Sequence, residues 1–153
     1  MIKKYIDIVE SAIDSLGVKA AEIRGDEPGQ WQIFRGPISL FIDLWIPEQN
    51  TDWNYTIEQN NNTTFQVIAP ITKLPDDENK FNFYEELLHM NFHLYKASLI
   101  INLKDSVLAV KYKQLAEDIS QKDIIDALEC TGYYAEMLTE YFVKKYGVKK
   151  ISE

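Results

Sequence analysis

Residues 81–112 constrain the fold most, because their apolar spacing changes from helical to extended within one short stretch. Phe83, Leu87 and Met90 recur at the spacing of one helix face, which predicts a short helix at the start of the stretch. Further along, apolar and polar side chains alternate, and the polar link 104–106 can satisfy the backbone of a chain reversal. The stretch therefore predicts a helix followed by a β-hairpin.

Two amphipathic helices are predicted at the ends of the chain, over residues 2–16 and 122–146. In each, apolar side chains recur on one stripe and charged side chains lie opposite. Gly17 and Gly147 follow these helices and can take the left-handed conformation that ends a helix. Ser120 is the expected N-cap of the second helix.

Alternating segments joined by short polar links lie between the first helix and the middle one, which indicates an antiparallel meander. The predicted strands span residues 30–35, 38–46, 53–58 and one from 63 to near Pro75, with polar turns at 47–51 and 59–62. Gly36-Pro37 ends the first of these strands, and the pattern leaves the register of residues 30–35 open. An acidic turn at 76–79 precedes the middle helix, and either Asn79 or Asn82 is the expected N-cap.

The order of these elements predicts an α+β fold over a single domain, residues 1–153. The fold class is one antiparallel sheet of five or six strands in α-β-β-β-α-β-β-α order, with the N- and C-terminal helices packed on one face. The number of strands depends on whether residues 30–35 add a sixth.

The sheet face away from those helices is predicted to remain apolar. If the registers hold, it carries Phe41, Trp45, Ile68, Ile100, Leu108 and Val110. Such a face exceeds what a monomer usually exposes, so these residues are the predicted partner-binding surface, for another protein or for a second copy in a homodimer. Sheet packing is the alternative role for the aromatic residues of this region, including Trp31, Trp53 and Tyr55.

The acidic composition excludes several classes of partner. A net charge of −8 and a pI near 4.8 argue against nucleic acid and against an anionic membrane surface, which both require clustered Lys and Arg. They allow a basic or partly unfolded protein partner. We identify neither a signal peptide nor a membrane span, so the expected location is the cytoplasm.

Few residues suggest chemistry. His89 and His93 are one helical turn apart, as in some metal sites, but no third ligand and no His-Glu-x-x-His motif accompany them. Cys130, the only cysteine, lies on an apolar helix stripe, where an inert buried thiol is expected. We therefore predict no enzyme, no metal and no cofactor. The alternative is a small-ligand or metal sensor, or a cryptic enzyme, with a site near the middle helix.

The second half of the chain resembles a known family. Leu74-Pro75 closes a strand, residues 83–91 are similar to a "Tyr … Leu-Leu … Asn" helix, and 97–110 follow as a hairpin. Together with the two terminal helices, these features resemble the YbjN-type domains and the class I chaperones of type III secretion, which share the Tir-chaperone-like fold. Residues 30–35 and the long polar turns bring the resemblance nearer to the YbjN type.

The resemblance implies a small, acidic, cytoplasmic and non-enzymatic protein that is often dimeric. For the secretion chaperones it further implies that an extended segment of an effector is held. For the YbjN type it implies a proposed regulatory role. The function expected from the sequence is therefore a chaperone-like or regulatory protein-binding module that acts through apolar sheet surface.

Overall fold

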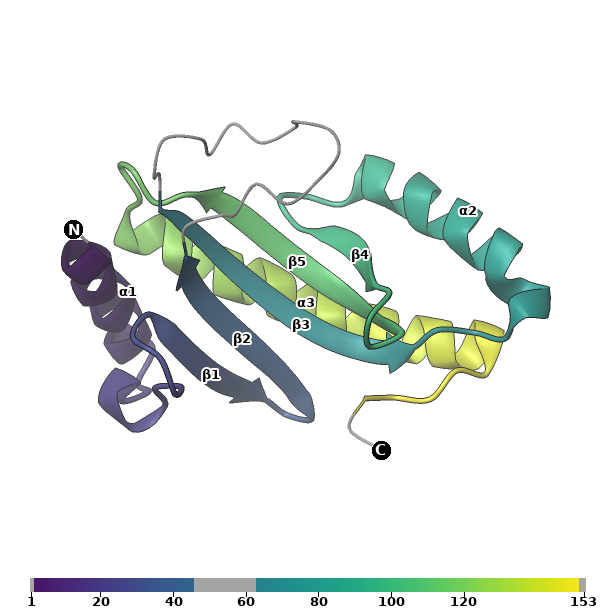
Figure 1. Ribbon diagram of the computed structural model, residues 1–153, viewed down its shortest axis with the longest axis horizontal. Coiled ribbons are helices and arrows are strands. Elements are labelled where there is room, and N and C mark those ends of the chain that lie inside the picture. The colour runs from purple at the N-terminus through teal and green to yellow at the C-terminus, as the bar shows by residue number, and fades with distance from the viewer. Residues whose placement is uncertain (1, 46–62, 152–153) are drawn as a thin grey trace.

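The structure is a computed structural model, and it describes residues 2–45 and 63–151. Within them, five strands form one antiparallel sheet in the order β1-β2-β3-β5-β4, accompanied by three α-helices (Figure 1). The elements are α1 (Ile2–Ser15), a 3-10 turn η1 (Ala20–Glu22), β1 (Gln30–Arg35), β2 (Ile38–Trp45), β3 (Thr64–Lys73), α2 (Asp77–His93), β4 (Ser98–Asn102), β5 (Val107–Leu115) and α3 (Gln121–Tyr146). The predicted α+β class and element order are confirmed.

Residues 30–35 form a full strand, β1, paired along its length with β2. β2 pairs directly with β3, so the described sheet has five strands. The predicted strand at 53–58, the turns at 47–51 and 59–62, and the last residue of the predicted strand 38–46 lie outside the described residues.

α1 and α3 cover the same face of the sheet, as predicted. The α3 stripe packs across β2, β3 and β5, while α1 contacts α3 and β2. Every second residue of β2 and β3 points into this layer, which is the period of a strand with one buried face. The fully buried large side chains of the core include Ile13, Ile42, Phe65, Val67, Ile71, Val110, Ile124 and Phe142.

Polar contacts fix α1 to the first strand. The Glu10 carboxylate accepts hydrogen bonds from the Arg24 guanidinium at 2.7 and 2.8 Å and from the Trp31 indole N–H at 3.1 Å. Because the Trp31 ring is itself buried, its N–H requires this partner. The Arg24 hydrogen bonds hold the pKa of the Glu10 carboxyl below its ordinary value.

The ends of the helices agree only in part with the sequence prediction. Ser120 caps α3 in a capping box with Asp123, and Gly147 ends the helix at a φ of 65°, both as expected. The expected N-caps of α2, Asn79 and Asn82, are wrong, because the helix begins earlier and Asp76 is its N-cap. The acidic segment predicted as a turn is instead the first helical turn, where negative side chains suit the helix dipole.

The segment after α3 forms an isolated bridge to β3. Thr72 forms an antiparallel bridge with Lys150, and the Ile151 N–H donates to the Ile71 carbonyl at 3.1 Å. The β2–β3 ladder stops at the pair Phe41–Ile68. Pro70 follows in β3, and it has no N–H to donate to a neighbouring strand. β2 and the end of β3 therefore separate toward the β1–β2 turn.

α2 lies beside β4 at the edge of the sheet and does not cover the face away from α1 and α3 (Figure 1). Its buried Phe83 packs against the rings of Phe142 and Tyr146 on α3, at centroid distances of 5.4 and 5.2 Å. The Asn91 side chain satisfies both backbone groups of Leu99 in β4, donating to its carbonyl at 3.0 Å and accepting from its N–H at 2.7 Å. β4 is an edge strand, and the Asn91 amide pairs with backbone groups of Leu99 that could otherwise pair with another strand.

Replacing Asn91 by Asp tests this attachment. The carboxylate keeps the acceptor for the Leu99 N–H but faces the Leu99 carbonyl without a donor, so we expect a loss of about 1 to 3 kcal/mol in the free energy of unfolding. Urea unfolding measures it. Asn82→Asp, at an exposed side chain of the same helix, is the control and should stay within about 0.5 kcal/mol of the wild type. Equal effects of the two changes would contradict the role of Asn91.

Candidate protein-binding surface

The side chains of the sheet that point away from α1 and α3 form what we call the open face. Phe34 on β1 and Phe41 on β2 are its exposed aromatic residues, with 69% and 39% of their surface accessible. Phe41 is directly opposite Ile68 of β3 in the ladder, so these two side chains are cross-strand neighbours. The open face thus presents apolar groups from adjacent strands to solvent.

Four of the six predicted surface residues lie on the open face. They are Phe41, Trp45, Ile68 and Ile100, all exposed or half-buried. Ile100 is opposite Ala109 of β5 in the ladder, and β5 separates it from Ile68 on β3. The structure therefore brings Phe41 and Ile68 together and leaves Ile100 two strands away.

The predicted placement of Leu108 and Val110 on this face is wrong. Both side chains are fully buried and belong to the opposite, helix-covered face of β5. β5 is apolar on both sides over its first half, so alternation alone does not decide which side is inward. The ladder with β3 shows which side is inward. Lys111 is directly opposite the open-face residue Ile68, so the preceding residue, Val110, must point to the core.

Phe34 is the open-face residue that the sequence prediction missed. It pairs with Ser39 of β2, two residues before Phe41, and faces the same way. Its neighbour Trp31 points to the core and is buried, so the alternation of β1 was present in the sequence. Because the sequence leaves the register of residues 30–35 open, this alternation alone does not assign Phe34 to the open face.

A groove opens where β2 and the end of β3 separate. Its cavity volume is about 480 Å³. Phe34, Phe41 and Pro70 line it from the open face, and Thr139 and Glu140 of α3 line its far side. The groove is therefore continuous with the exposed aromatic residues, and it is wide enough to receive a side chain from another molecule.

Charged groups are also present on the open face. Asp43 is half-buried, and this burial raises the pKa of its carboxyl, although the Gln66 amide donates a hydrogen bond to it at 3.4 Å. The Lys113 ammonium lies 5.6 Å from the centre of the Trp45 ring, within the range of a cation–π interaction. The half of the face near Asp43 is thus more polar than the half near Phe34.

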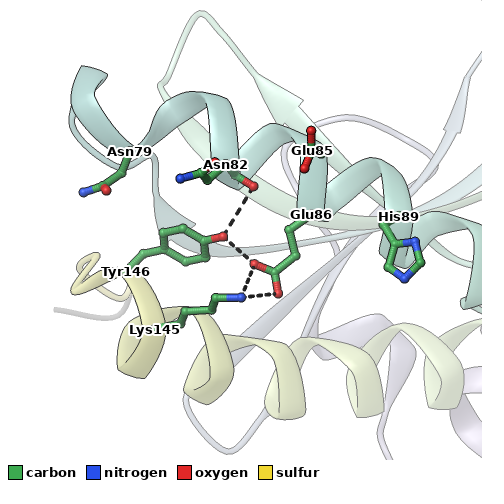
Figure 2. Close-up of a pocket in the computed structure, with 7 residues that line it drawn as sticks. All are labelled: Asn79, Asn82, Glu85, Glu86, His89, Lys145 and Tyr146. Atoms are coloured by element: carbon green, nitrogen blue, oxygen red, sulfur yellow. Dashed lines mark hydrogen bonds and ion pairs between the residues drawn. The ribbon is translucent and has the colours of Figure 1, made fainter.

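A second candidate is the polar cluster between α2 and α3. Figure 2 shows the Glu86 carboxylate pointing from α2 toward Lys145 and Tyr146 of α3. Lys145 lies 2.9 Å from it, and the Tyr141 and Tyr146 hydroxyls both donate to it. The adjoining cavity of about 540 Å³ is lined by Asn79, Asn82, Glu85, Glu86, His89, Lys145 and Tyr146.

The electrostatics of this cluster are those of a stable ion pair. Burial is the largest influence on the Glu86 carboxyl and by itself raises its pKa, but the hydrogen bonds from Tyr141, Tyr146 and Lys145 together lower the pKa below its ordinary value. The Glu86 hydrogen bond raises the pKa of Lys145, and burial followed by the same carboxylate raises that of Tyr146 to about 12. These groups hold α2 against α3, which is a structural role.

The other residues considered for chemistry do not form a site. The rings of His89 and His93 are 5.1 Å apart and exposed, and α2 continues through both. Among residues 2–45 and 63–151, no three His, Cys, Asp or Glu side chains gather in a way that could hold a metal. Burial raises the pKa of the Cys130 thiol, which donates to the Tyr95 carbonyl at 2.9 Å. In the same part of the chain, no helix is long and apolar enough to cross a membrane.

Comparison with solved structures identifies the same fold in two protein complexes. A chain of the crystal structure of the ExsC-ExsE complex matches with a TM-score of 0.63 and 11% identity, covering 92% of this chain and 94% of that one. A chain of the HopA1-SchA chaperone-effector complex matches with a TM-score of 0.62 and 10% identity, covering 89% and 93%. No protein-family model and no curated protein matches the chain.

These likenesses show that this chain has the same fold as those chains over almost its whole length. At this identity they concern the arrangement of the elements. The resemblance to the YbjN type rests on the sequence motifs alone and stays a prediction.

Glu86→Gln tests the cluster between the helices. An amide cannot accept from three donors without turning its own NH₂ toward one of them, so we expect a loss of about 1 to 2 kcal/mol in the free energy of unfolding at neutral pH. Glu85→Gln, at the exposed neighbouring glutamate, is the matched control and should change it by less than about 0.5 kcal/mol.

The pH dependence of the same pair provides an independent check. The pKa of Glu86 is lower in the folded protein than its ordinary value of 4.5. The ionised carboxylate therefore stabilises the fold at a pH above 4.5, and this stabilisation is lost as the pH falls through the folded-state pKa. The difference in stability between wild type and Glu86→Gln should therefore shrink as the pH is lowered from 4.5. A difference that stays constant or grows on acidification would refute the assignment.

Proposed function

We propose that this protein is a non-enzymatic, chaperone-like or regulatory module that binds an extended apolar segment of another protein on the open face of its sheet. The observation that carries the proposal is the exposed pair Phe34 and Phe41 beside a groove, on a sheet face that no helix of the described chain covers. Aromatic side chains next to a pocket are the usual anchors of protein interfaces.

The end of the β2–β3 ladder near the groove favours an extended segment. The β2–β3 ladder ends at Phe41, and Ile38 and Ser39 line the groove beyond that point. A partner in β conformation can pair with such a strand through its main chain and place alternate side chains into the pocket. An apolar side chain fits there because Pro37, Ile38 and Pro70 form much of the lining.

The fold supports the same class of function. Of the two similar solved structures described above, one is a chaperone-effector complex, and the other is also a complex. By analogy of fold, we propose that this chain also acts by holding a protein partner, in the cytoplasm and without catalysis. Membership of the YbjN type, and with it a regulatory role, is part of the proposal.

Self-association is the second part of the proposal. A homodimer is expected where a chain exposes more apolar surface than a monomer usually does. The structure retains such surface on the open face and, more extensively, on α2, where Phe81, Leu88 and Phe92 are exposed.

Binding of peptides measures the proposed function directly. We expect the protein to bind segments with alternating apolar residues in an array of 20-residue peptides of varied charge. Phe34→Glu should weaken the binding of the best peptide at least tenfold, because it places a charge where an apolar side chain would be buried. Fluorescence anisotropy with the labelled peptide gives the dissociation constants.

Phe92→Glu is the matched control, since it makes the same change at an exposed aromatic residue on α2, away from the open face. It should leave peptide affinity unchanged, and thermal unfolding should show both variants folded. If no peptide binds, or if Phe92→Glu weakens binding as much as Phe34→Glu, the open face is not the binding surface.

A further inference from the structure

Residues 149–151, which follow α3, lie at one side of the groove between β2 and the end of β3. We call them the bridging segment. β5 pairs with β3 at Thr72 and Lys73 from one side, so the segment lies on the side of β3 that faces β2. Lys150 and Ile151 line the groove together with residues of the open face. The segment therefore occupies the position that a further strand would take beside the end of β3.

The bridging segment pairs with β3 through its main chain. The Ile151 N–H donates to the Ile71 carbonyl at 3.1 Å, and the Lys73 N–H donates to the Lys149 carbonyl at 2.9 Å. These are the hydrogen bonds of antiparallel strands, and they involve backbone groups that every residue except proline carries. Another extended segment in the same position can therefore make the same bonds.

The side chains of the bridging segment match the groove in charge and polarity. The Lys150 ammonium lies 2.8 Å from the Glu140 carboxylate of α3, and Ile151 follows as an apolar residue of the lining. Glu136 is a second carboxylate in the lining, and Arg35 is its partner at 3.0 Å. The groove thus combines apolar side chains with acidic groups from α3, and the segment supplies a basic residue followed by an aliphatic one.

The attachment of the bridging segment is easily reversed. It forms an isolated bridge in place of a longer ladder. The Glu140 side chain remains 72% exposed, and an exposed ion pair adds little stability. Gly147 ends α3 and Val148 is buried in the core. Residues 149–151 can therefore detach from β3 while α3 and its packing stay in place.

We propose that the bridging segment is an internal stand-in for the partner, and that the partner binds by displacing it. The partner strand takes over the hydrogen bonds of Ile71 and Lys73, places a Lys or Arg side chain beside Glu140, and places the next, aliphatic side chain in the groove. This inference rests on the proposed binding of an extended segment at the groove, and it names the chemistry of that segment. The net charge of −8 favours the approach of such a basic segment.

A disulfide that holds the bridging segment on β3 tests the displacement. Thr72 and Lys150 are opposite each other at a position where no hydrogen bonds join them, and Cα atoms in such pairs are about 4.5 Å apart, which a disulfide can span. The variant is Thr72→Cys/Lys150→Cys in a Cys130→Ser background. The probe is a labelled 20-residue peptide with alternating apolar residues and one central Lys-Ile pair.

We expect the oxidised variant to bind this peptide at least tenfold more weakly than the reduced variant, as measured by fluorescence anisotropy. The two forms have the same sequence, so each is the matched control of the other, and thermal unfolding shows whether both are folded.

Ile151→Pro is the opposite change, because proline lacks the N–H that donates to the Ile71 carbonyl. It should release the bridging segment and raise the affinity for the Lys-Ile peptide at least threefold over the wild type.

The failure of this inference differs from the failure of the proposed function. If the oxidised and reduced variants bind the peptide equally and Ile151→Pro keeps the wild-type affinity, the partner does not displace the segment, and binding on the open face still stands. If neither the wild type nor Ile151→Pro binds this peptide or any other of the array, the proposed function fails, and the inference fails with it.

The charge preference is measured with a second peptide in which Glu replaces the central Lys. The wild type should bind the Lys peptide at least tenfold more tightly than the Glu peptide, and Glu140→Lys should abolish or reverse this preference. Because the ratio of two affinities is compared, an effect of the substitution on the bridging segment itself cancels.

Glu85→Lys is the matched control, since it makes the same change in net charge at an exposed position on α2, away from the groove. It should keep the wild-type preference. If it changes the preference as much as Glu140→Lys does, the overall charge of the protein selects the peptide, and the pairing of a basic side chain with Glu140 is wrong.

Discussion

The packing of α3 across the sheet is the interaction on which the rest of the structure depends. At 1.5 Å per residue its 26 residues extend about 39 Å, enough to cross β2, β3 and β5 and reach α1 and α2. Each large side chain it buries, such as Ile124 or Phe142, contributes about 1.5 to 3 kcal/mol. Gly132 of α3 leaves room for the side chain of Arg35, because a Cβ at this position would lie only 2.8 Å from it. Arg35 in turn forms an ion pair with Glu136 on the same helix. Because α3 and α1 occupy one face, no helix of the described residues covers the other face.

Elements with one apolar face were predictable from the sequence, and elements with two were not. α1, α3 and β2 each alternate cleanly between apolar and polar sides, and their spans and inward faces agree with the prediction. β5 is apolar on both sides over Leu108 and Val110, so its inward face follows only from its pairing with β3. For a strand of this kind the position of the lysines is the better guide, because a Lys side chain rarely points into a core.

The same ambiguity hid the outer face of α2. Its apolar residues lie on two opposite sides, and the sequence prediction used only the inner set that includes Phe83 and Leu87. The sequence does contain the second set, but only the structure distinguishes the side that α3 covers from the one that remains exposed. The role of Asn91 was also invisible from the sequence, because its partner Leu99 is fixed by the turn between α2 and β4.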